Sequence, residues 1–260
     1  MSERTNYDQV ADRYDNQRYR GKEPDLDLAA FLTEQSGPDT NALRILDLGC
    51  GTGSHLVANE SLISAGRMVG LDRSAGMLAQ ARPKAPEIAW VQGDATRLPF
   101  KEASFDYISN QFSYHHVPDK AALVAQVWRV LRPDGRFAIS NVCIHGMPGW
   151  ALYHYFPAAW ERDLQDFLPN EAIKQLFEHA GFHNVTINQR HWTETEDLHQ
   201  LLTEARQRTT SQLTMISEFD YQAGLHRMEA ELSIATGDVV IVPSEVCLVT
   251  IVGNKLPPED

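Results

Sequence analysis

Basic side chains are scarce in this sequence. Its 260 residues include 23 Lys and Arg against 35 Asp and Glu, which gives a formal net charge of -12. Binding to the phosphate backbone of nucleic acids relies on clustered Lys and Arg, and the chain contains no Lys/Arg-rich run. The charge balance therefore argues against broad nucleic-acid binding, and we expect no nucleic-acid partner.

Long apolar runs and grouped cysteines are also missing. No apolar stretch approaches the roughly 18 residues of a membrane-spanning helix, and the polar, amphipathic first 20 residues lack the pattern of a secretory leader. The three cysteines, Cys50, Cys143 and Cys247, lie far apart, without the spacing of metal ligands. We expect a cytoplasmic protein with no membrane insertion and no bound metal.

No Gly/Ser- or Pro-rich linker and no internal repeat divides the chain. Hydrophobic residues make up 43% of it, enough for a sizeable core. We therefore expect one domain over residues 1–260. Its segments are 1–42 with N-terminal helices, 43–142 as the core, 143–183 with an aromatic segment and a helix, 193–243 as an inserted helical cap, and 244–253 as the last strand.

Strands and helices alternate through the expected core. Continuous apolar runs such as "ALRILDLGC" and "RMVGLD" are typical of strands buried on both faces, and "DKAALVAQVWRVL" has the spacing of an amphipathic helix. Strands that alternate with helices indicate a parallel, doubly wound α/β sheet of Rossmann-like type. Ligands of such sheets bind at the carboxyl ends of the strands.

A glycine-rich loop follows the first of these strands, in "RILDLGCGTG". Gly49, Gly51 and Gly53 have the spacing G-x-G-x-G, one residue shorter than the dinucleotide fingerprint G-x-G-x-x-G. Asp47 stands just before the loop, where a carboxylate would repel a pyrophosphate but attract an ammonium group. The loop therefore predicts a ligand that carries an amine.

Two further acids end the next two strands. Asp72 is placed to accept both hydroxyl groups of a ribose, as the acid of nucleotide-binding βαβ units does. Asp94 is placed to accept a hydrogen bond from an exocyclic amine such as that of adenine. Together with Asp47 they describe a ligand with an amine, a ribose and an adenine.

Four stretches, "ILDLGCGTG", "VGLDRSAGMLAQA", "GDATRLPFKEASFDYISNQFSYHHV" and "LRPDGRFAI", resemble in order and spacing the class I S-adenosylmethionine-dependent methyltransferases. The likeness is greatest to the UbiE-type and related small-molecule branch. It implies a seven-stranded sheet whose last strand is antiparallel, and S-adenosyl-L-methionine as the cofactor, which leaves as S-adenosyl-L-homocysteine.

The resemblance also implies cofactor-binding residues. Those around the methionine part are Asp47, Gly49, Cys50, Gly51 and Gly53; those at the ribose and adenine are Asp72, Arg73, Met77, Asp94 and Ala95; Asn110 lies beside the methyl group, and Tyr14 and Tyr19 cover the cofactor.

A general base is needed only if the methyl acceptor must lose a proton. The candidates are His115 and His116 in "SYHHVPD", which follows the fourth strand, and His154 in an aromatic helix. Each of these histidines has an alternative structural role, in loop organisation or packing. Four aromatic residues can either pack as core or wall an acceptor pocket: Tyr114, Trp150, Tyr153 and Tyr155.

These observations predict an enzyme that methylates an O, N or C atom of a small organic acceptor, aromatic or apolar in character. Two alternatives stay open: a quinone-biosynthesis-type C-methyltransferase and a protein that binds S-adenosylmethionine without catalysis. The apolar stripe at Leu198, Leu201 and Leu202 fits either a lid or a dimer face, so monomer and homodimer are both possible.

Overall fold

The computed structural model describes residues 6–12, 14–16, 23–35, 42–208, 210–235 and 237–257. Its strands are β1 (Ile45–Leu48), β2 (Met68–Asp72), β3 (Ala89–Gln92), β4 (Phe105–Gln111), β5 (Leu131–Val142), β6 (His183–Asp197) and β7 (Ile241–Asn254). Its α-helices are α1 (Leu26–Glu34), α2 (Ser54–Ala58), α3 (Ala75–Ala81), α4 (Lys120–Val130), α5 (Ala151–Tyr155), α6 (Pro157–Asp166), α7 (Asn170–His179), α8 (Leu198–Gln207), α9 (Ser211–Thr214) and α10 (Glu218–Ile234).

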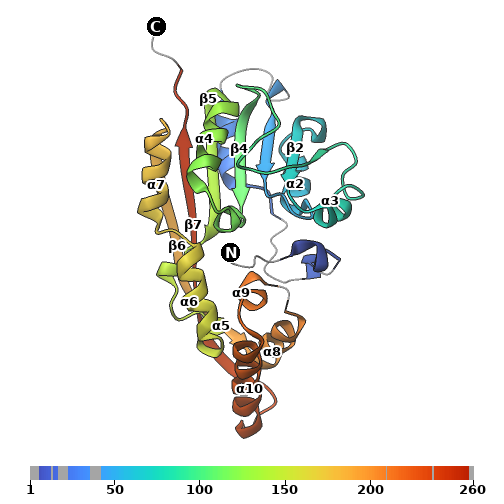
Figure 1. Ribbon diagram of the computed structural model, residues 1–260, viewed down its shortest axis with the longest axis vertical. Coiled ribbons are helices and arrows are strands. Elements are labelled where there is room, and N and C mark those ends of the chain that lie inside the picture. The colour runs from blue at the N-terminus through green and yellow to red at the C-terminus, as the bar shows by residue number, and fades with distance from the viewer. Residues whose placement is uncertain are drawn as a thin grey trace. The chain divides into compact units, whose positions relative to one another are not determined.

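The seven strands form one sheet in the order β3-β2-β1-β4-β5-β7-β6. Strands β1 to β5 pair in parallel. β7 runs the other way, and in Figure 1 its arrow points opposite to that of β4. The pairing agrees, since Gly135 near the start of β5 accepts a hydrogen bond from the backbone of Lys255, just after β7, while Ser140 lies beside Thr250. The expected Rossmann-like sheet with an antiparallel last strand is confirmed.

The strand order reverses between β1 and β4. The chain builds β1, β2 and β3 outward on one side, then returns to place β4 and β5 on the other side of β1. A crevice opens at such a switch point, at the carboxyl ends of the two central strands. The loops that follow β1 and β4 therefore flank the place where a ligand is expected.

The chain separates into two compact units. The sheet unit comprises Tyr7–Asn141, Asn170–Asn188 and the chain from Val249 onward; the helical unit comprises Val142–Pro169 and Gln189–Leu248. Both β6 and β7 contribute residues to each unit. The expectation of one domain over residues 1–260, divided into the segments given above, stays a prediction.

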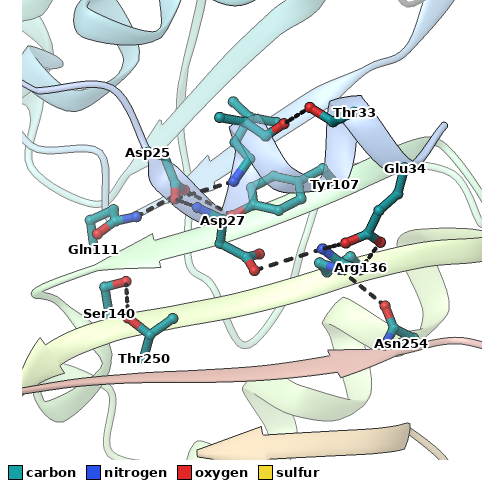
Figure 2. A network of polar contacts seen from close by, with 12 residues as sticks. Asp25, Asp27, Thr33, Glu34, Tyr107, Gln111, Arg136, Ser140, Thr250 and Asn254 are labelled. Carbon is teal, nitrogen blue, oxygen red and sulfur yellow. Dashed lines mark hydrogen bonds and ion pairs between the residues drawn. The ribbon is translucent and has the colours of Figure 1, made fainter. Parts of the chain in front are cut away.

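Helix α1 is fixed to the sheet of the sheet unit by a polar network (Figure 2). Asp25 caps the helix and also accepts hydrogen bonds from Tyr107 Oη at 2.8 Å and Gln111 Nε2 at 3.0 Å, both on β4. Arg136 of β5 pairs with Glu34 at the other end of the helix, at 2.5 Å. Anchoring at both ends holds α1 against β4 and β5.

Two sequence-based expectations about helices were wrong. The periodic segment from Tyr7 does not form a continuous helix; its described parts are two 3-10 turns, Tyr7–Gln9 and Tyr14–Asn16. A short isolated helix has only marginal stability in water. This segment is instead held in place by the side-chain contacts of its aspartates. The helical excursion expected to start at 193 begins only at Leu198, because β6 continues to Asp197, whose side chain caps α8.

Candidate functional site

The glycine loop joins β1 to α2 at the switch point. Its three glycines have positive φ angles, +70° at Gly49, +54° at Gly51 and +78° at Gly53. Side chains disfavour this region of backbone space, so glycine suits each position. The backbone N–H of Gly51 donates to Oδ2 of Asp72 at 2.8 Å. This bond ties the loop after β1 to the end of β2.

The three glycines differ in what a side chain would meet. A Cβ at Gly49 would lie 2.1 Å from Oγ of Ser113, and one at Gly53 would lie 2.4 Å from the ring of Trp90. A Cβ at Gly51 would meet only Cε1 of Tyr14, at 3.8 Å. Gly49 and Gly53 are thus required by packing within the protein, whereas Gly51 is the position where the loop leaves open space.

Asp47 and Asp72 are both buried at this end of the sheet. Asp47 is 2% exposed and accepts a hydrogen bond from Ser109 Oγ at 2.9 Å. Its removal from water raises the pKa of its carboxyl to about 8, in spite of that bond. Burial also raises the pKa of Asp72, against the lowering effect of the N–H groups of Ser74 and Gly51. Both sites favour a neighbouring positive charge or hydrogen-bond donor.

The predicted adenine-side residues surround the ends of β2 and β3. Asp94 is exposed, and the N–H of Thr96, 2.8 Å from Oδ1, lowers the pKa of its carboxyl. Arg73 is exposed, Ala95 is half-buried, and Met77 is buried in α3. The structure therefore leaves the carboxylate of Asp94 accessible.

Asn110 lies at the end of β4, across the switch point from the glycine loop. Its Nδ2 donates to the carbonyl oxygen of Leu48 at 2.8 Å and to Ser113 Oγ at 2.7 Å. Its Oδ1 is buried without a hydrogen-bond partner among the described residues. Since buried polar atoms are normally paired, this carbonyl is an acceptor available to a ligand.

The N-terminal segment, residues 6–12 and 14–16, contacts the loops that follow β1 and β2. Asp8 accepts hydrogen bonds from Ser74 Oγ at 2.5 Å and from the N–H of Gly76 at 2.8 Å, at the start of α3. Asp15 accepts one from Thr52 Oγ1 at 2.5 Å and forms an ion pair of 2.5 Å with Lys84. Two carboxylates therefore hold this segment against the loops.

Apolar contacts complete the same docking. Val10 and Ala11 are buried against Met77, and the partly buried rings of Tyr7 and Tyr14 pack on this cluster. Tyr14, predicted to cover the cofactor, is also the residue nearest to the open side of Gly51. Tyr19, predicted for the same role, lies outside the described residues.

A row of polar and aromatic side chains extends from the N-terminal segment to β5. Tyr7 Oη lies 2.6 Å from Nε2 of His116, whose ring centroid is 3.8 Å from that of His115. Nδ1 of His115 lies 3.1 Å from Nδ2 of Asn141. Two predicted catalytic histidines are therefore in contact with one another.

Tyr114 precedes this histidine pair and is fully enclosed. It is 1% exposed, burial raises the pKa of its hydroxyl, and Oη has no hydrogen-bond partner in the described part of the chain. Its predicted contact with the acceptor stays a prediction.

The helical unit contains a cavity of about 400 Å³, which we call the aromatic cavity. Among the residues that line it are Tyr153, His154, Tyr155, Trp160, Glu231 and Val242. Trp150 packs edge-on against the ring of Tyr153, with the centroids 4.9 Å apart. Three of the residues predicted for catalysis or acceptor binding thus line one cavity, and His154 belongs to a different unit from His115 and His116.

The cysteines are buried and form no metal site. Cys50 packs in the core of the sheet unit, and burial raises the pKa of its thiol. Cys143 and Cys247 lie opposite one another on neighbouring chain segments, joined by a backbone hydrogen bond of 2.7 Å. Among the described residues no group of three or more His, Cys, Asp or Glu is placed to hold a metal ion. No helix in that part of the chain is long and apolar enough to cross a membrane.

Sequence reasoning missed several residues of this region: Tyr7, Asp8, Asp15, Lys84, Asn141 and Glu231. One signal was present, since the dipeptide Tyr-Asp occurs at 7–8 and again at 14–15. Both copies contact the loops described above. The other residues carry no local pattern, because their partners lie far away in the sequence.

Three comparisons bear on this site. Residues 46–139 match the family model described as a methyltransferase domain. Demethylmenaquinone methyltransferase of Lactococcus lactis is 31% identical over 181 residues, which cover 60% of this chain and 72% of that protein. The matched region contains the glycine loop, Asp72, Asp94 and Asn110.

Solved structures share the fold. A protein of Bacillus halodurans described as a methyltransferase has a TM-score of 0.59 at 18% identity, over 89% of this chain and 99% of that chain. Phosphoethanolamine N-methyltransferase 2 of Haemonchus contortus, in complex with S-adenosyl-L-methionine, has a TM-score of 0.56 at 18% identity, over 97% of this chain and 60% of that chain.

Proposed function

This chain belongs to the class I S-adenosylmethionine-dependent methyltransferases of the UbiE type, and from that membership we propose that it methylates an O, N or C atom of a small organic acceptor. It is an S-adenosylmethionine-dependent enzyme.

The unpaired Oδ1 of Asn110 is the observation that carries the proposed cofactor site. It is a buried acceptor on the β4 side of the switch point, and the open side of Gly51 lies on the β1 side. The buried carboxyls of Asp47 and Asp72 lie at the same edge of the sheet, and a bound positive charge would favour their ionised form. These residues fit a ligand that brings donors, an ammonium group and a ribose.

Each residue then has a defined task. When bound, S-adenosylmethionine supplies an electrophilic methyl group on a sulfonium. Asp47 would hold the ammonium group, Asp72 would accept from the ribose hydroxyls, and Asp94 would accept from the adenine amine. Asn110 would offer its carbonyl to the bound cofactor. Because a thioether leaves readily, the protein mainly orients the acceptor and excludes water.

His115 and His116 are the proposed proton acceptors where the methylated atom must lose a proton. Their rings are in contact, with the centroids 3.8 Å apart. Tyr7 donates its hydroxyl proton to Nε2 of His116 while that ring is neutral. The N-terminal segment is thus connected to the proposed base, and Tyr14 covers the loop at Gly51.

Calorimetric titration with S-adenosylmethionine and S-adenosylhomocysteine tests the cofactor site. Asp94→Ala removes a carboxylate that, among the described residues, accepts hydrogen bonds from the N–H and hydroxyl of Thr96 alone, so the fold should persist while affinity falls by about tenfold. Asp72→Ala should abolish binding, with thermal unfolding as the check that the loop still folds. Glu87→Ala, an exposed acid away from these loops, is the control. Failure of both ligands to bind the wild type would overturn the proposal.

A quinone is the second candidate acceptor. The observation that favours it is the 31% identity to demethylmenaquinone methyltransferase over 72% of that enzyme. To test this candidate, the protein is incubated with S-adenosylmethionine and a prenylated naphthoquinol, and the products are analysed by mass spectrometry. Gain of one methyl group on a ring carbon supports a quinone acceptor. Cofactor binding without methylation of any acceptor in a broad screen would instead favour a protein that binds S-adenosylmethionine without catalysis.

A further inference from the structure

The aromatic cavity is walled by rings that contact one another in pairs, at steep angles between their planes. Tyr153 and Trp160 have ring centroids 4.9 Å apart at 59°, and His154 and Tyr155 have theirs 4.9 Å apart at 80°. All four residues line the cavity. Ring faces carry negative potential and attract cations, so walls made of several rings favour a positively charged ligand.

Both tyrosines of the cavity donate their hydroxyl protons to carboxylates. Tyr153 Oη donates to Oδ2 of Asp163 at 2.7 Å, and Tyr155 Oη donates to Oε2 of Glu231 at 2.9 Å. A phenol that donates to a carboxylate gains electron density in its ring, because the hydroxyl takes on part of the character of a phenolate. The two rings therefore attract a cation more strongly than ordinary tyrosine rings.

Negative formal charge lies in the cavity wall itself. Glu231 lines it, and Gly149, another lining residue, donates its N–H to Oε2 of Glu245 at 2.8 Å. Within the described part of the helical unit, Glu231 forms no ion pair. Arg227, four residues before Glu231 on α10, directs Nη1 to the carbonyl oxygen of Tyr155 at 2.6 Å. The carboxylate of Glu231 therefore keeps its charge available to a ligand.

We propose that the aromatic cavity is a binding site for a small organic cation, namely a protonated amine or quaternary ammonium ion with an apolar body. Its volume of about 400 Å³ is within the usual range for small-molecule sites. The rings of Tyr155 and Trp160 contact the apolar body and the charge, and Glu231 compensates the charge. This goes beyond methyl transfer, since the cavity binds its ligand whether or not that ligand is methylated.

The test compares choline with 3,3-dimethylbutan-1-ol, which has the same shape but carbon in place of the charged nitrogen. Binding is followed by tryptophan fluorescence without any S-adenosylmethionine, so failure here is distinct from failure of the methyltransferase assignment. We expect choline to bind about tenfold more tightly than the alcohol. Equal or tighter binding of the alcohol would overturn the proposal.

Matched variants on α10 locate the site. Glu231→Gln should weaken choline binding by about three- to tenfold and leave the alcohol unchanged. Glu229→Gln removes an acid two residues away on the same helix, where it pairs with Arg206, and should change neither. Equal losses in the two variants would show a general charge effect and would overturn the assignment to this cavity. Thermal unfolding of each variant checks that the helical unit remains folded.

Discussion

Tyr7 Oη and His116 Nε2 form a hydrogen bond of 2.6 Å, although 109 residues separate them in the chain. This contact ties the N-terminal segment to the loop after β4. Asp8 and Asp15 tie the same segment to the loops after β2 and β1. One short stretch of chain is therefore fastened to three of the four loops at which the cofactor is proposed to bind.

The first prediction concerns the Tyr7–His116 bond. Tyr7→Phe and His116→Gln should each weaken S-adenosylhomocysteine binding by a few-fold. The fold-loss in affinity of the double variant should be smaller than the product of the two single fold-losses. A double-mutant cycle in calorimetric affinities measures the coupling, which we expect to be about 1 kcal/mol. Tyr114→Phe is the control, because its hydroxyl has no hydrogen-bond partner among the described residues, and it should show no coupling to His116.

The second prediction concerns the ion pair between Asp15 and Lys84. Nζ of Lys84 also donates to the carbonyl oxygen of Thr52 at 2.7 Å, inside the glycine loop. Both side chains are about one third exposed, so solvent screening limits the pair to about 0.5–1 kcal/mol. Lys84→Met should therefore raise the cofactor dissociation constant and KM by about two- to fivefold and leave kcat nearly unchanged.

The control for that ion pair is Arg206→Met. It breaks an exposed pair with Glu229 in the helical unit and should leave cofactor affinity unchanged. If Lys84→Met lowered kcat with no effect on affinity, the docking role assigned to Asp15 and Lys84 would be wrong.

The third prediction concerns Gly51, the loop glycine that leaves open space for the proposed ligand. Gly51→Ala strains a residue at φ +54°, which costs about 1 kcal/mol, yet its Cβ meets no atom closer than 3.8 Å. Stability should fall slightly, whereas S-adenosylmethionine binding should fall by tenfold or more, because the methyl group occupies the proposed ligand space. Gly66→Ala, with open space around its Cβ, should change neither quantity in thermal shift and calorimetric assays.

The fourth prediction follows from the buried Asp47. Its pKa is raised to about 8 in the folded state, against about 3.9 in an unfolded chain. The folded state therefore binds more protons, and this group's contribution to stability is present below pH 4 and is lost as pH rises to about 8. Asp47→Asn should be more stable than the wild type by a few kcal/mol at pH 8 and equal to it near pH 4.

Denaturant unfolding of the cofactor-free protein at several pH values measures this difference. Asp27 and Asp163, whose pKa values burial raises to about 6, are present in both proteins and cancel in the comparison. A stability difference that does not change with pH would contradict the assignment of the raised pKa to Asp47.

The fifth prediction couples the same group to the cofactor. At pH 7 the carboxyl of Asp47 is mostly protonated in the free protein, and the ammonium group of a bound cofactor would lower its pKa. Binding should release close to one proton in the wild type and far less in Asp47→Asn. Calorimetry in buffers of different ionisation enthalpy counts the protons, and identical release by the two proteins would place the ammonium group elsewhere.

The sequence predicted the sheet well because its central strands are buried runs with clear ends. β2, Met68–Asp72, lies within the predicted run "RMVGLD", and the family resemblance rested on motifs in loops next to such strands. The N-terminal segment was mispredicted as helical because its apolar residues have helical spacing. In the structure, its conformation depends on the contacts that Asp8 and Asp15 make with other loops. Their partners, Ser74 and Lys84, lie more than 60 residues away, beyond any local pattern.

For the aromatic cavity, the sequence predicted the rings but not the carboxylate beside them. Tyr153 and Tyr155 were predicted to line an acceptor pocket because rings gather in that stretch. Glu231 was not predicted, since one glutamate on a helix rich in charged residues has no distinguishing neighbours in sequence. Only tertiary structure places it against the hydroxyl of Tyr155.

The burial of all three cysteines makes site-specific labelling practical. Burial raises the pKa of the thiols of Cys50 and Cys247, so maleimide reagents, which need an accessible thiolate, will react with them slowly. A single cysteine introduced at the exposed Asp12 can then carry a spin or fluorescent label without removal of the native thiols. Such a probe would report directly how long the N-terminal segment stays docked during each catalytic cycle.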